Sequence, residues 1–287
     1  MEFEHLNPRQ FDQFCDFIYK ESGIRIDERK VTLLSNRIRR RLKAGNFPDF
    51  DVYYKFLTSA AGADELAGFL DAITTNETFF FRTEKHFDWL RNEFVPELLQ
   101  QQRAGKRSAS LRIWSAGCAS GAEAYTIAIC LAEESFRLRD WSLHILGTDI
   151  SEDALREARE GVYKQRSIEG VSEKQLRRHF RTVDADRWQV RDEIRELVEF
   201  QKHNLMTPLE QPKFDCIFIR NVLIYFDRQS KQTVIDHLLN SLVPGGYLVV
   251  GPSEGIFDML GSLRRISPLL YQKADETLQR AGGRREV

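Results

Sequence analysis

The chain of 287 residues is 42% hydrophobic, so it can bury one large core and still leave room for a smaller domain. Its 42 basic and 43 acidic side chains leave a net charge of −1, which excludes overall attraction to nucleic acid or to an anionic membrane. Four scattered cysteines argue against a zinc site or a disulfide framework, and the absence of a signal-peptide pattern or a ~20-residue apolar run predicts a cytoplasmic protein.

The first 75 residues have the pattern of an all-helical domain. Asn7 as a cap and Pro8 in the first turn begin a helix that Gly23 ends. A second helix is predicted over 29–44, and shorter ones over 52–57 and 63–73. Basic side chains flank the narrow apolar stripe of the second helix, with no acidic residue among them. Such a run is usually a solvated face, but it also favours an acidic partner.

Residues 74–82, Thr-Thr-Asn-Glu-Thr-Phe-Phe-Phe-Arg, join this domain to the rest of the chain. Asn76 and Thr78 offer short polar contacts and Arg82 offers a cation, as a loop that closes over a ligand requires. The alternative is an interdomain linker that its three phenylalanines anchor to the following domain. Both interpretations are compatible with the residues.

From residue 111 onward, short apolar strands alternate with helices, which is the pattern of a doubly wound parallel sheet. We predict strands at 111–115, 143–148, 198–203, 215–220 and 246–251, helices at 121–137, 151–160 and 228–242, and a closing antiparallel strand at 269–273. The polar stretch 161–195 is too long for a connection and predicts an inserted subdomain, with a turn at 184–187 before a strand that holds Trp188 and Val190. The tail, about 277–287, is expected to be disordered.

Residues 111–125, LRIWSAGCASGAEAY, run from a strand through a turn of small residues into a helix. Such a turn lets the backbone approach a ligand closely. A dinucleotide fingerprint needs a second glycine two positions after Gly117, where this chain has Ala119, so pyrophosphate binding is disfavoured and a dehydrogenase is remote. S-adenosylmethionine fits better because it contains an adenosine without phosphates.

Polar residues near the ends of the predicted strands are candidates for ligand contacts. Asp149 can accept both ribose hydroxyl protons, or it can simply cap the next helix. Glu123 can face the ligand's amino group or ribose, or it can be an ordinary surface residue that suits the helix dipole. Asn221 and Tyr225 follow strand 215–220, although Tyr225 can also be a core aromatic with its hydroxyl at the rim. No pair of histidines has metal-ligand spacing, so no metal is predicted.

Taken in order, segments 76–82, 114–125, 147–150, 203–205 and 220–226 resemble the CheR family of chemotaxis receptor methyltransferases. The resemblance implies an N-terminal helical domain over 1–75 and a class I methyltransferase domain over 76–287, with a small antiparallel β subdomain inserted over 161–200. It also implies methyl-ester formation from S-adenosylmethionine, with S-adenosylhomocysteine as product, on glutamate side chains of the cytoplasmic helical bundle of chemoreceptors.

Carried over by motif position, the resemblance assigns Tyr225 and Arg82 to the border of the methyl-acceptor position. It makes Arg37, Arg40 and Arg41 the expected receptor-binding residues. The expected cofactor contacts are Asn76, Thr78, Arg82, Gly117, Glu123, Asp149, Asn204, Leu205, Asn221 and Val222.

Two alternatives and one departure qualify this expectation. The chain can be a class I methyltransferase for another protein or a small molecule, or a non-catalytic sensor that binds S-adenosylmethionine. The inserted segment FRTVDADRWQVRDEI lacks the glycine-rich turn of relatives that tether to a receptor's C-terminal peptide, which argues against such tethering.

Overall fold

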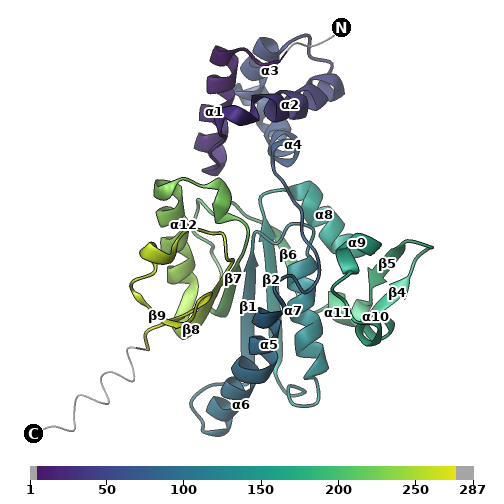
Figure 1. Cartoon of the computed structure of the whole chain (residues 1–287), viewed down its shortest axis with the longest axis vertical. Helices are drawn as coiled ribbons and strands as arrows, with labels where there is room; N and C mark the ends of the chain where they lie inside the picture. Colours follow the sequence, from purple (N-terminus) through teal and green to yellow (C-terminus); the bar gives the residue numbers. More distant parts are fainter. Residues whose placement is uncertain (1–4, 276–287) are drawn as a thin grey trace, which may run out of the picture.

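A computed structural model describes residues 5–275, arranged as a small helical domain above a larger α/β domain (Figure 1). The tail expected to be disordered, about 277–287, lies outside the described residues. A second, smaller sheet projects from one side of the larger domain (Figure 1). The fold class expected from the sequence is therefore confirmed.

The N-terminal domain contains the four predicted helices, α1 (Pro8–Ser22), α2 (Val31–Gly45), α3 (Phe50–Leu57) and α4 (Ala63–Ile73), and the short 3-10 turns η1 (Glu28–Lys30) and η2 (Ala60–Gly62). The side chain of Asn7 accepts a hydrogen bond from Gln10 N in a capping box, and Gly23 ends α1 in the left-handed conformation. Phe14, Tyr53 and Phe69 pack together at the centre of this domain.

Residues 83–110, for which no element was predicted, contain one continuous helical rod. It consists of α5 (Glu84–Trp89), the π-helical turn η3 (Leu90–Phe94) and α6 (Val95–Arg103). Pro96 lacks the N–H of a regular helical bond and lies in the first turn of α6, just after the π turn, where a helix tolerates proline. Trp89 and Phe94 of the rod contact Tyr247 of the sheet, with ring centroids 5.1 and 5.4 Å apart.

The main sheet has seven strands in the order β6-β2-β1-β7-β8-β10-β9. The five predicted strands are parallel: β1 (Ser110–Ala116), β2 (Ser142–Asp149), β6 (Val198–Lys202), β7 (Phe214–Ile219) and β8 (Leu242–Val250). The predicted closing strand is β10 (Leu270–Lys273), antiparallel to β8. The edge strand β9 (Leu263–Ser267) was not predicted, because four of its five residues are exposed and two of them are arginines, so it carries little strand signal.

Helices cover both faces of the sheet and leave an apolar core on each. Helix α7 (Ala122–Glu133) and the α5–α6 rod pack on one face, whereas α12 (Arg228–Ser241) packs on the other; α8 (Glu152–Glu160) follows β2. Successive residues Ile113 and Trp114 of β1 enter opposite cores, as strand alternation requires. The chain runs from β1 outward to β2 and β6 and then returns to β7 on the other side of β1, which creates a topological switch point between β1 and β7.

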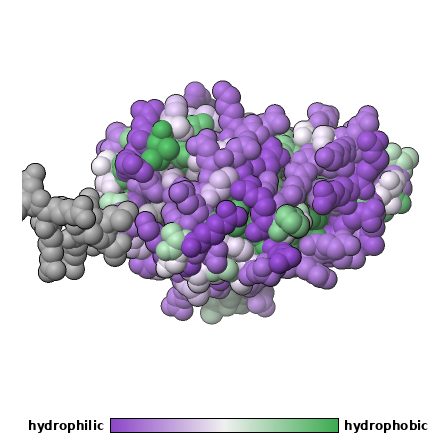
Figure 2. All heavy atoms as spheres, turned by 90° about the horizontal axis from the view of Figure 1, so that it is seen from below, coloured by the Kyte–Doolittle hydropathy of each residue, from purple (hydrophilic) through white to green (hydrophobic). Residues whose placement is uncertain are grey.

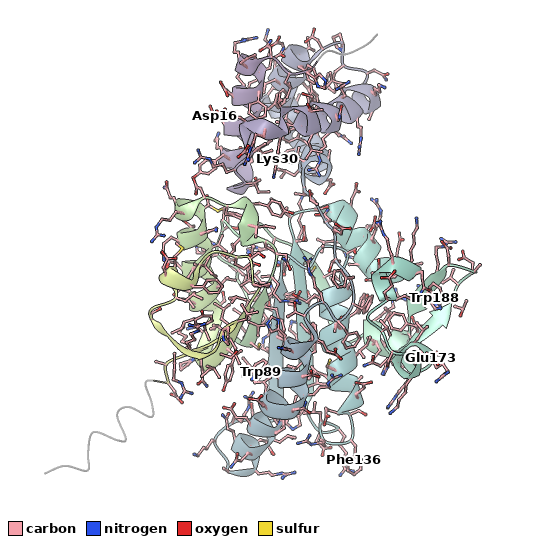
Figure 3. The ribbon with its side chains drawn as sticks, viewed as in Figure 1. Asp16, Lys30, Trp89, Phe136, Glu173 and Trp188 are labelled. Atoms are coloured by element: carbon pink, nitrogen blue, oxygen red, sulfur yellow. The ribbon has the colours of Figure 1, made fainter. Side chains whose placement is uncertain are left out.

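The inserted segment forms an antiparallel sheet in the order β3-β5-β4, made of β3 (Val162–Lys164), β4 (Phe180–Thr182) and β5 (Arg187–Val190). The predicted turn is present, because Val183 N donates to Arg187 O, and Trp188 lies on β5 as expected (Figure 3). Three short helices in the insertion were not predicted: α9 (Gln165–Ile168), α10 (Glu173–His179) and α11 (Asp192–Arg195).

Hydrophilic side chains cover most of the end of the molecule farthest from the N-terminal domain (Figure 2). Within residues 5–275, every helix is too short or too polar to cross a lipid bilayer.

Candidate functional site

A pocket lies where the carboxyl ends of β1, β2, β6 and β7 face the N-terminal domain. It encloses about 1320 Å³, counting the solvent at its mouth. Open α/β sheets bind ligands beyond their strand ends at the switch point, and the pocket is in that place. Its lining includes every residue that the sequence proposed for the cofactor or the methyl acceptor: Asn76, Thr78, Arg82, Gly117, Glu123, Asp149, Asn204, Leu205, Asn221, Val222 and Tyr225.

The glycine-containing loop after β1 is packed too tightly for a larger residue. Gly117 has a φ of 72°, and a Cβ added there would lie 2.4 Å from Cγ2 of Val222. Ala119 also adopts the left-handed conformation, with a φ of 50°. The loop therefore presents backbone rather than side chains to the pocket.

Asp149 holds this loop against the start of α8. One carboxylate oxygen accepts from Ala119 N at 2.8 Å and the other from Ser151 N at 2.9 Å. The side chain is buried, which raises the pKa of Asp149, while these N–H bonds oppose the shift. A carboxylate has about four acceptor positions, and Ile150 N also interacts with this one, so at least one position remains for a hydroxyl donor. Capping and ligand binding are thus compatible roles.

Glu123 is one half of a buried ion pair. One of its oxygens accepts from Ser115 Oγ at 2.7 Å, and the other accepts from Arg220 Nη1 at 2.8 Å. The side chains of Arg220 and Glu123 are only 2% and 11% exposed. Arg220 also donates to the carbonyl of Arg82, so one guanidinium ties the linker to the strand ends. Arg220 was not predicted from the sequence, although an arginine directly after a buried strand was an available signal.

Glu254, a second residue that was not predicted from the sequence, holds the chain after β7. It is completely buried and accepts from Leu223 N at 2.8 Å and from Asn221 N. These bonds fix Asn221 in the left-handed conformation, with a φ of 59°. Burial raises the pKa of Glu254, and the backbone donors oppose that shift. Its position in Gly-Pro-Ser-Glu-Gly, just beyond β8, was the signal that could have identified it.

The linker forms one wall of the pocket. Asn76 Nδ2 donates to Ser151 Oγ at 3.0 Å, and Phe80 is buried against Tyr163 and Phe180 of the insertion. Both sequence interpretations of the linker are therefore compatible with the structure. Four of the five non-glycine residues with positive φ lie in or beside the pocket walls: Phe81, Thr83, Ala119 and Asn221. Backbone strain of this kind concentrates at functional sites.

Comparison with known proteins decides the family. Residues 9–74 match the family model described as CheR methyltransferase, all-alpha domain, and residues 76–267 match CheR methyltransferase, SAM binding domain. The chain belongs to the CheR methyltransferase family. A chemotaxis protein methyltransferase of Borreliella burgdorferi is 37% identical over 268 residues, covering 92% of this chain and 94% of the relative. A chemotaxis protein methyltransferase of Escherichia coli is 32% identical over 254 residues, covering 87% of this chain and 85% of the relative.

Among solved structures, a glycopeptide N-methyltransferase complexed with S-adenosyl-L-methionine can be aligned over 53% of this chain and 52% of the glycopeptide N-methyltransferase chain. The identity is 11% and the TM-score 0.32, which is too small a likeness to support an inference.

In this CheR methyltransferase, the cations Lys30, Arg37 and Arg82 are among the residues that line the pocket. The guanidinium of Arg82 stacks over the ring of Phe79 at 5.3 Å, and Lys30 Nζ lies 5.9 Å from the ring centroid of Tyr225. Arg37 donates to Thr75 Oγ1 at 2.8 Å and to the carbonyl of Ile73. Within residues 5–275, no carboxylate forms an ion pair with Arg82, Lys30 or Arg37.

The three arginines expected to bind a receptor have different surroundings. Arg41 makes a bidentate pair with Glu65, with bonds of 2.8 and 2.6 Å, and that carboxylate also accepts from Tyr53. Arg37 is half-buried against the linker, whereas Arg40 is exposed. The bonds to Glu65 hold the partly exposed Arg41 side chain against the N-terminal domain, and receptor binding by the three arginines stays a prediction.

Asn204 also has a structural role that its motif did not reveal. Its Nδ2 donates to the carbonyl of Glu21 at 2.8 Å, and its Oδ1 accepts from Met206 N at 3.0 Å. The residue therefore connects the loop after β6 to the end of α1. No cluster of three or more potential metal ligands occurs in the described part of the chain.

Proposed function

We propose that this methyltransferase transfers the methyl group of S-adenosylmethionine to glutamate carboxylates on the cytoplasmic helical bundle of chemoreceptors, and releases S-adenosylhomocysteine. The observation that carries the proposal is one pocket with two unlike sides. A tight glycine loop and the carboxylate of Asp149 line one side, and the cations Lys30, Arg37 and Arg82 line the other. The first side suits an uncharged adenosine and the second an acidic side chain.

The residues present fit the cofactor. The glycine loop presents backbone to the pocket, because a Cβ at Gly117 would collide with Val222, so a nucleoside can lie close to the main chain, and Asp149 retains acceptor capacity for a ribose hydroxyl. We assign the remaining contacts to Asn76, Thr78, Glu123, Leu205, Asn221 and Val222, which line the same pocket, and to Asn204 beside them. When bound, S-adenosylmethionine supplies a methyl group activated by the positive charge on its sulfur.

The chain's own task is to hold and orient the acceptor. A glutamate side chain is already ionised near neutral pH, so the reaction needs no general base to remove a proton. Fixing an acceptor oxygen in line with its target and excluding water can lower the barrier by roughly 7–11 kcal/mol. Arg82 is held by stacking on Phe79 and attracts the carboxylate, and Tyr225 can donate to the carboxylate oxygen that does not attack.

This role for Tyr225 predicts a specific kinetic effect. Tyr225→Phe should lower kcat for receptor methylation about tenfold, because it removes a donor that orients the acceptor. The dissociation constant for S-adenosylhomocysteine, measured by calorimetry, should stay within about twofold of wild type, since the phenol lies on the acceptor side. Equal losses in turnover and in cofactor affinity would contradict the assignment.

The reaction itself is tested with S-adenosylmethionine labelled in the methyl group and membranes that contain chemoreceptors. We expect label in the receptor that mild alkali releases as methanol, as an ester requires. Stable label would mean a different acceptor atom, and label in a small molecule would mean another methyltransferase. Tight binding without any transfer would identify a sensor. Calorimetry with S-adenosylhomocysteine on Asp149→Ala tests the cofactor side separately, and unchanged affinity would contradict it.

A further inference from the structure

The segment that joins α1 to α2, residues 23–30, contacts the acceptor side of the pocket directly; we refer to it as the strap. Ile24 forms an antiparallel bridge with Phe226, and Arg25 N donates to Tyr225 O at 2.9 Å. The N-terminal domain is thus hydrogen-bonded to the backbone of the proposed acceptor-side tyrosine. These residues are about 200 positions apart in the sequence, so only the fold brings them together.

The strap fits closely against the larger domain. Gly23 has a φ of 72°, and a Cβ at this position would lie 2.5 Å from Sδ of Met206 and 3.1 Å from Cε1 of Phe226. The hydrogen bond from Asn204 Nδ2 to the carbonyl of Glu21 adds a polar contact beside it. Because the contact uses backbone bonds and close packing, a shift of the strap would be passed on to the residues around Tyr225.

The other end of the strap places a cation over the tyrosine ring. Lys30 lies in the lower part of the N-terminal domain (Figure 3). Its Nζ is 5.9 Å from the ring centroid of Tyr225. The nearby carboxylate of Asp27 is occupied by Arg29, whose Nε and Nη2 donate to its two oxygens at 2.8 and 2.9 Å. Lys30 is therefore left facing the ring and the pocket, where a cation can hold an aromatic face in one orientation.

Tyr225 needs such support from outside its own element. It ends η4 (Leu223–Tyr225), a 3-10 turn of three residues, and its N–H bond to Val222 O is long at 3.3 Å. The turn is too short to fix a side chain by its own regular bonds. The backbone bond from Arg25 and the cation of Lys30 are two interactions that reach Tyr225 from the N-terminal domain, and the charge of Arg37 also acts on its hydroxyl.

We infer that the strap is a positioning element for Tyr225, so that the N-terminal domain takes part in setting the acceptor geometry. This inference rests on the proposed function, because it requires Tyr225 to act on a methyl acceptor. Lys30 directly precedes α2, so a receptor that binds α2 would also be able to shift the strap.

The test compares two substitutions at one residue. Arg25→Pro removes the N–H that Tyr225 O accepts, whereas Arg25→Ala removes the same side chain and keeps the N–H. The extended backbone of Ile24 in its bridge is compatible with a following proline. We expect kcat for receptor methylation to be about tenfold lower in the proline variant than in the alanine variant. Affinity for S-adenosylhomocysteine should be the same in both.

A double-mutant cycle separates positioning from general damage. In a Tyr225→Phe background, Arg25→Pro should have nearly the same kcat as Arg25→Ala, because the group that the backbone bond positions is already gone. An equal difference between the two variants in both backgrounds, or no difference between them in the wild-type background, would overturn the inference. A wild-type protein that methylates no receptor would instead overturn the proposed function.

A second pair of variants covers the case in which Arg25→Pro does not fold, as judged by circular dichroism. Lys30→Met should lower kcat, and Lys30→Arg should restore most of it, because a guanidinium also stacks over an aromatic ring. The loss in Lys30→Met should be smaller in the Tyr225→Phe background, where only the direct attraction of Lys30 for the acidic acceptor is removed. Failure of the arginine to rescue, or the same loss in both backgrounds, would count against the strap as a positioning element.

Discussion

The two sides of the pocket differ in how their charges are satisfied. On the cofactor side, all four carboxylate oxygens of Glu123 and Asp149 accept hydrogen bonds from within the chain. On the acceptor side, Lys30, Arg37 and Arg82 have no carboxylate partner among residues 5–275. Each carboxylate oxygen of the first side thus has a partner once the chain is folded, whereas in the proposed function the cations of the second side pair with the carboxylate of the methyl acceptor. Changes on the first side should therefore affect stability and cofactor affinity, and changes on the second should affect turnover and encounter with the receptor.

The largest effect is expected from Arg220→Met. The substitution leaves Glu123 as a buried charge without its cation and also removes the bond to the Arg82 carbonyl. Breaking a buried pair from one side typically costs about 3–5 kcal/mol of unfolding free energy. Urea denaturation monitored by circular dichroism measures this loss.

The double variant Arg220→Met with Glu123→Gln provides the control. It removes both charges, so it should recover part of the stability that the single variant loses. If the unfolding free energy of Arg220→Met is within about 1 kcal/mol of the wild-type value, water must reach Glu123, and the cofactor side is less closed than the burial of Glu123 indicates.

A second effect concerns His86, a buried residue of α5 that is close enough to Arg220 to be affected by its charge. Burial and the positive charge of Arg220 lower the pKa of His86 from 6.5 to about 4, and neither ring nitrogen has a hydrogen-bond partner. Because the unfolded chain takes up this proton first, the folded state loses stability as the pH falls from 6.5 to 4. At 1.36 kcal/mol per unit, the loss reaches about 3 kcal/mol.

His86→Phe should remove this pH dependence, since an unpartnered buried ring can be replaced by an apolar ring of similar shape. Unfolding free energies of wild type and variant, measured at several pH values between 7 and 4, should diverge steadily as the pH falls. Parallel curves would show that His86 is accessible to protons in the folded protein. The raised pKa values of Asp149 and Glu254 act in the opposite direction and cancel in this comparison.

Local sequence signals were sufficient for most of the fold. Caps such as Asn7, the glycine after α1 and the apolar runs of five parallel strands are short-range features, and the structure confirms each. The edge strand β9 was missed because its side chains are mostly exposed. The helical rod 84–103 lies in a segment to which no element was assigned.

The pairings in the site could not be predicted in the same way. Glu123 and Arg220 are 97 residues apart, and only the order β2-β1-β7 brings their strand ends together. Glu254 meets Asn221 for the same reason, across β7 and β8. The sequence could therefore propose which residues face the pocket, but not which of them bind one another.

A smaller effect, on cofactor affinity, is expected from Gly117→Ala. The new Cβ would lie 2.4 Å from Val222 and would hold alanine at a φ of 72°, a conformation that costs about 1–2 kcal/mol. We expect affinity for S-adenosylhomocysteine to fall about tenfold or more by calorimetry. Gly105→Ala is the matched control, because Gly105 has a φ of 68° with nothing within 4 Å of the added Cβ. Equal affinity losses in both variants would contradict a ligand-facing loop.

The smallest effect is expected from Arg40→Glu on α2, outside the pocket lining. Arg40 is the exposed member of the three arginines proposed to meet the receptor, so reversing its charge should weaken electrostatic steering without disturbing packing. The initial rate of receptor methylation should fall roughly threefold at low salt, and the difference should shrink above about 0.15 M salt, where the Debye length is near 8 Å. Lys106→Glu makes the same charge change before the amino end of β1, away from the pocket. An equal, salt-dependent loss in Lys106→Glu would mean that the net charge of the protein, rather than the basic face of α2, attracts the receptor.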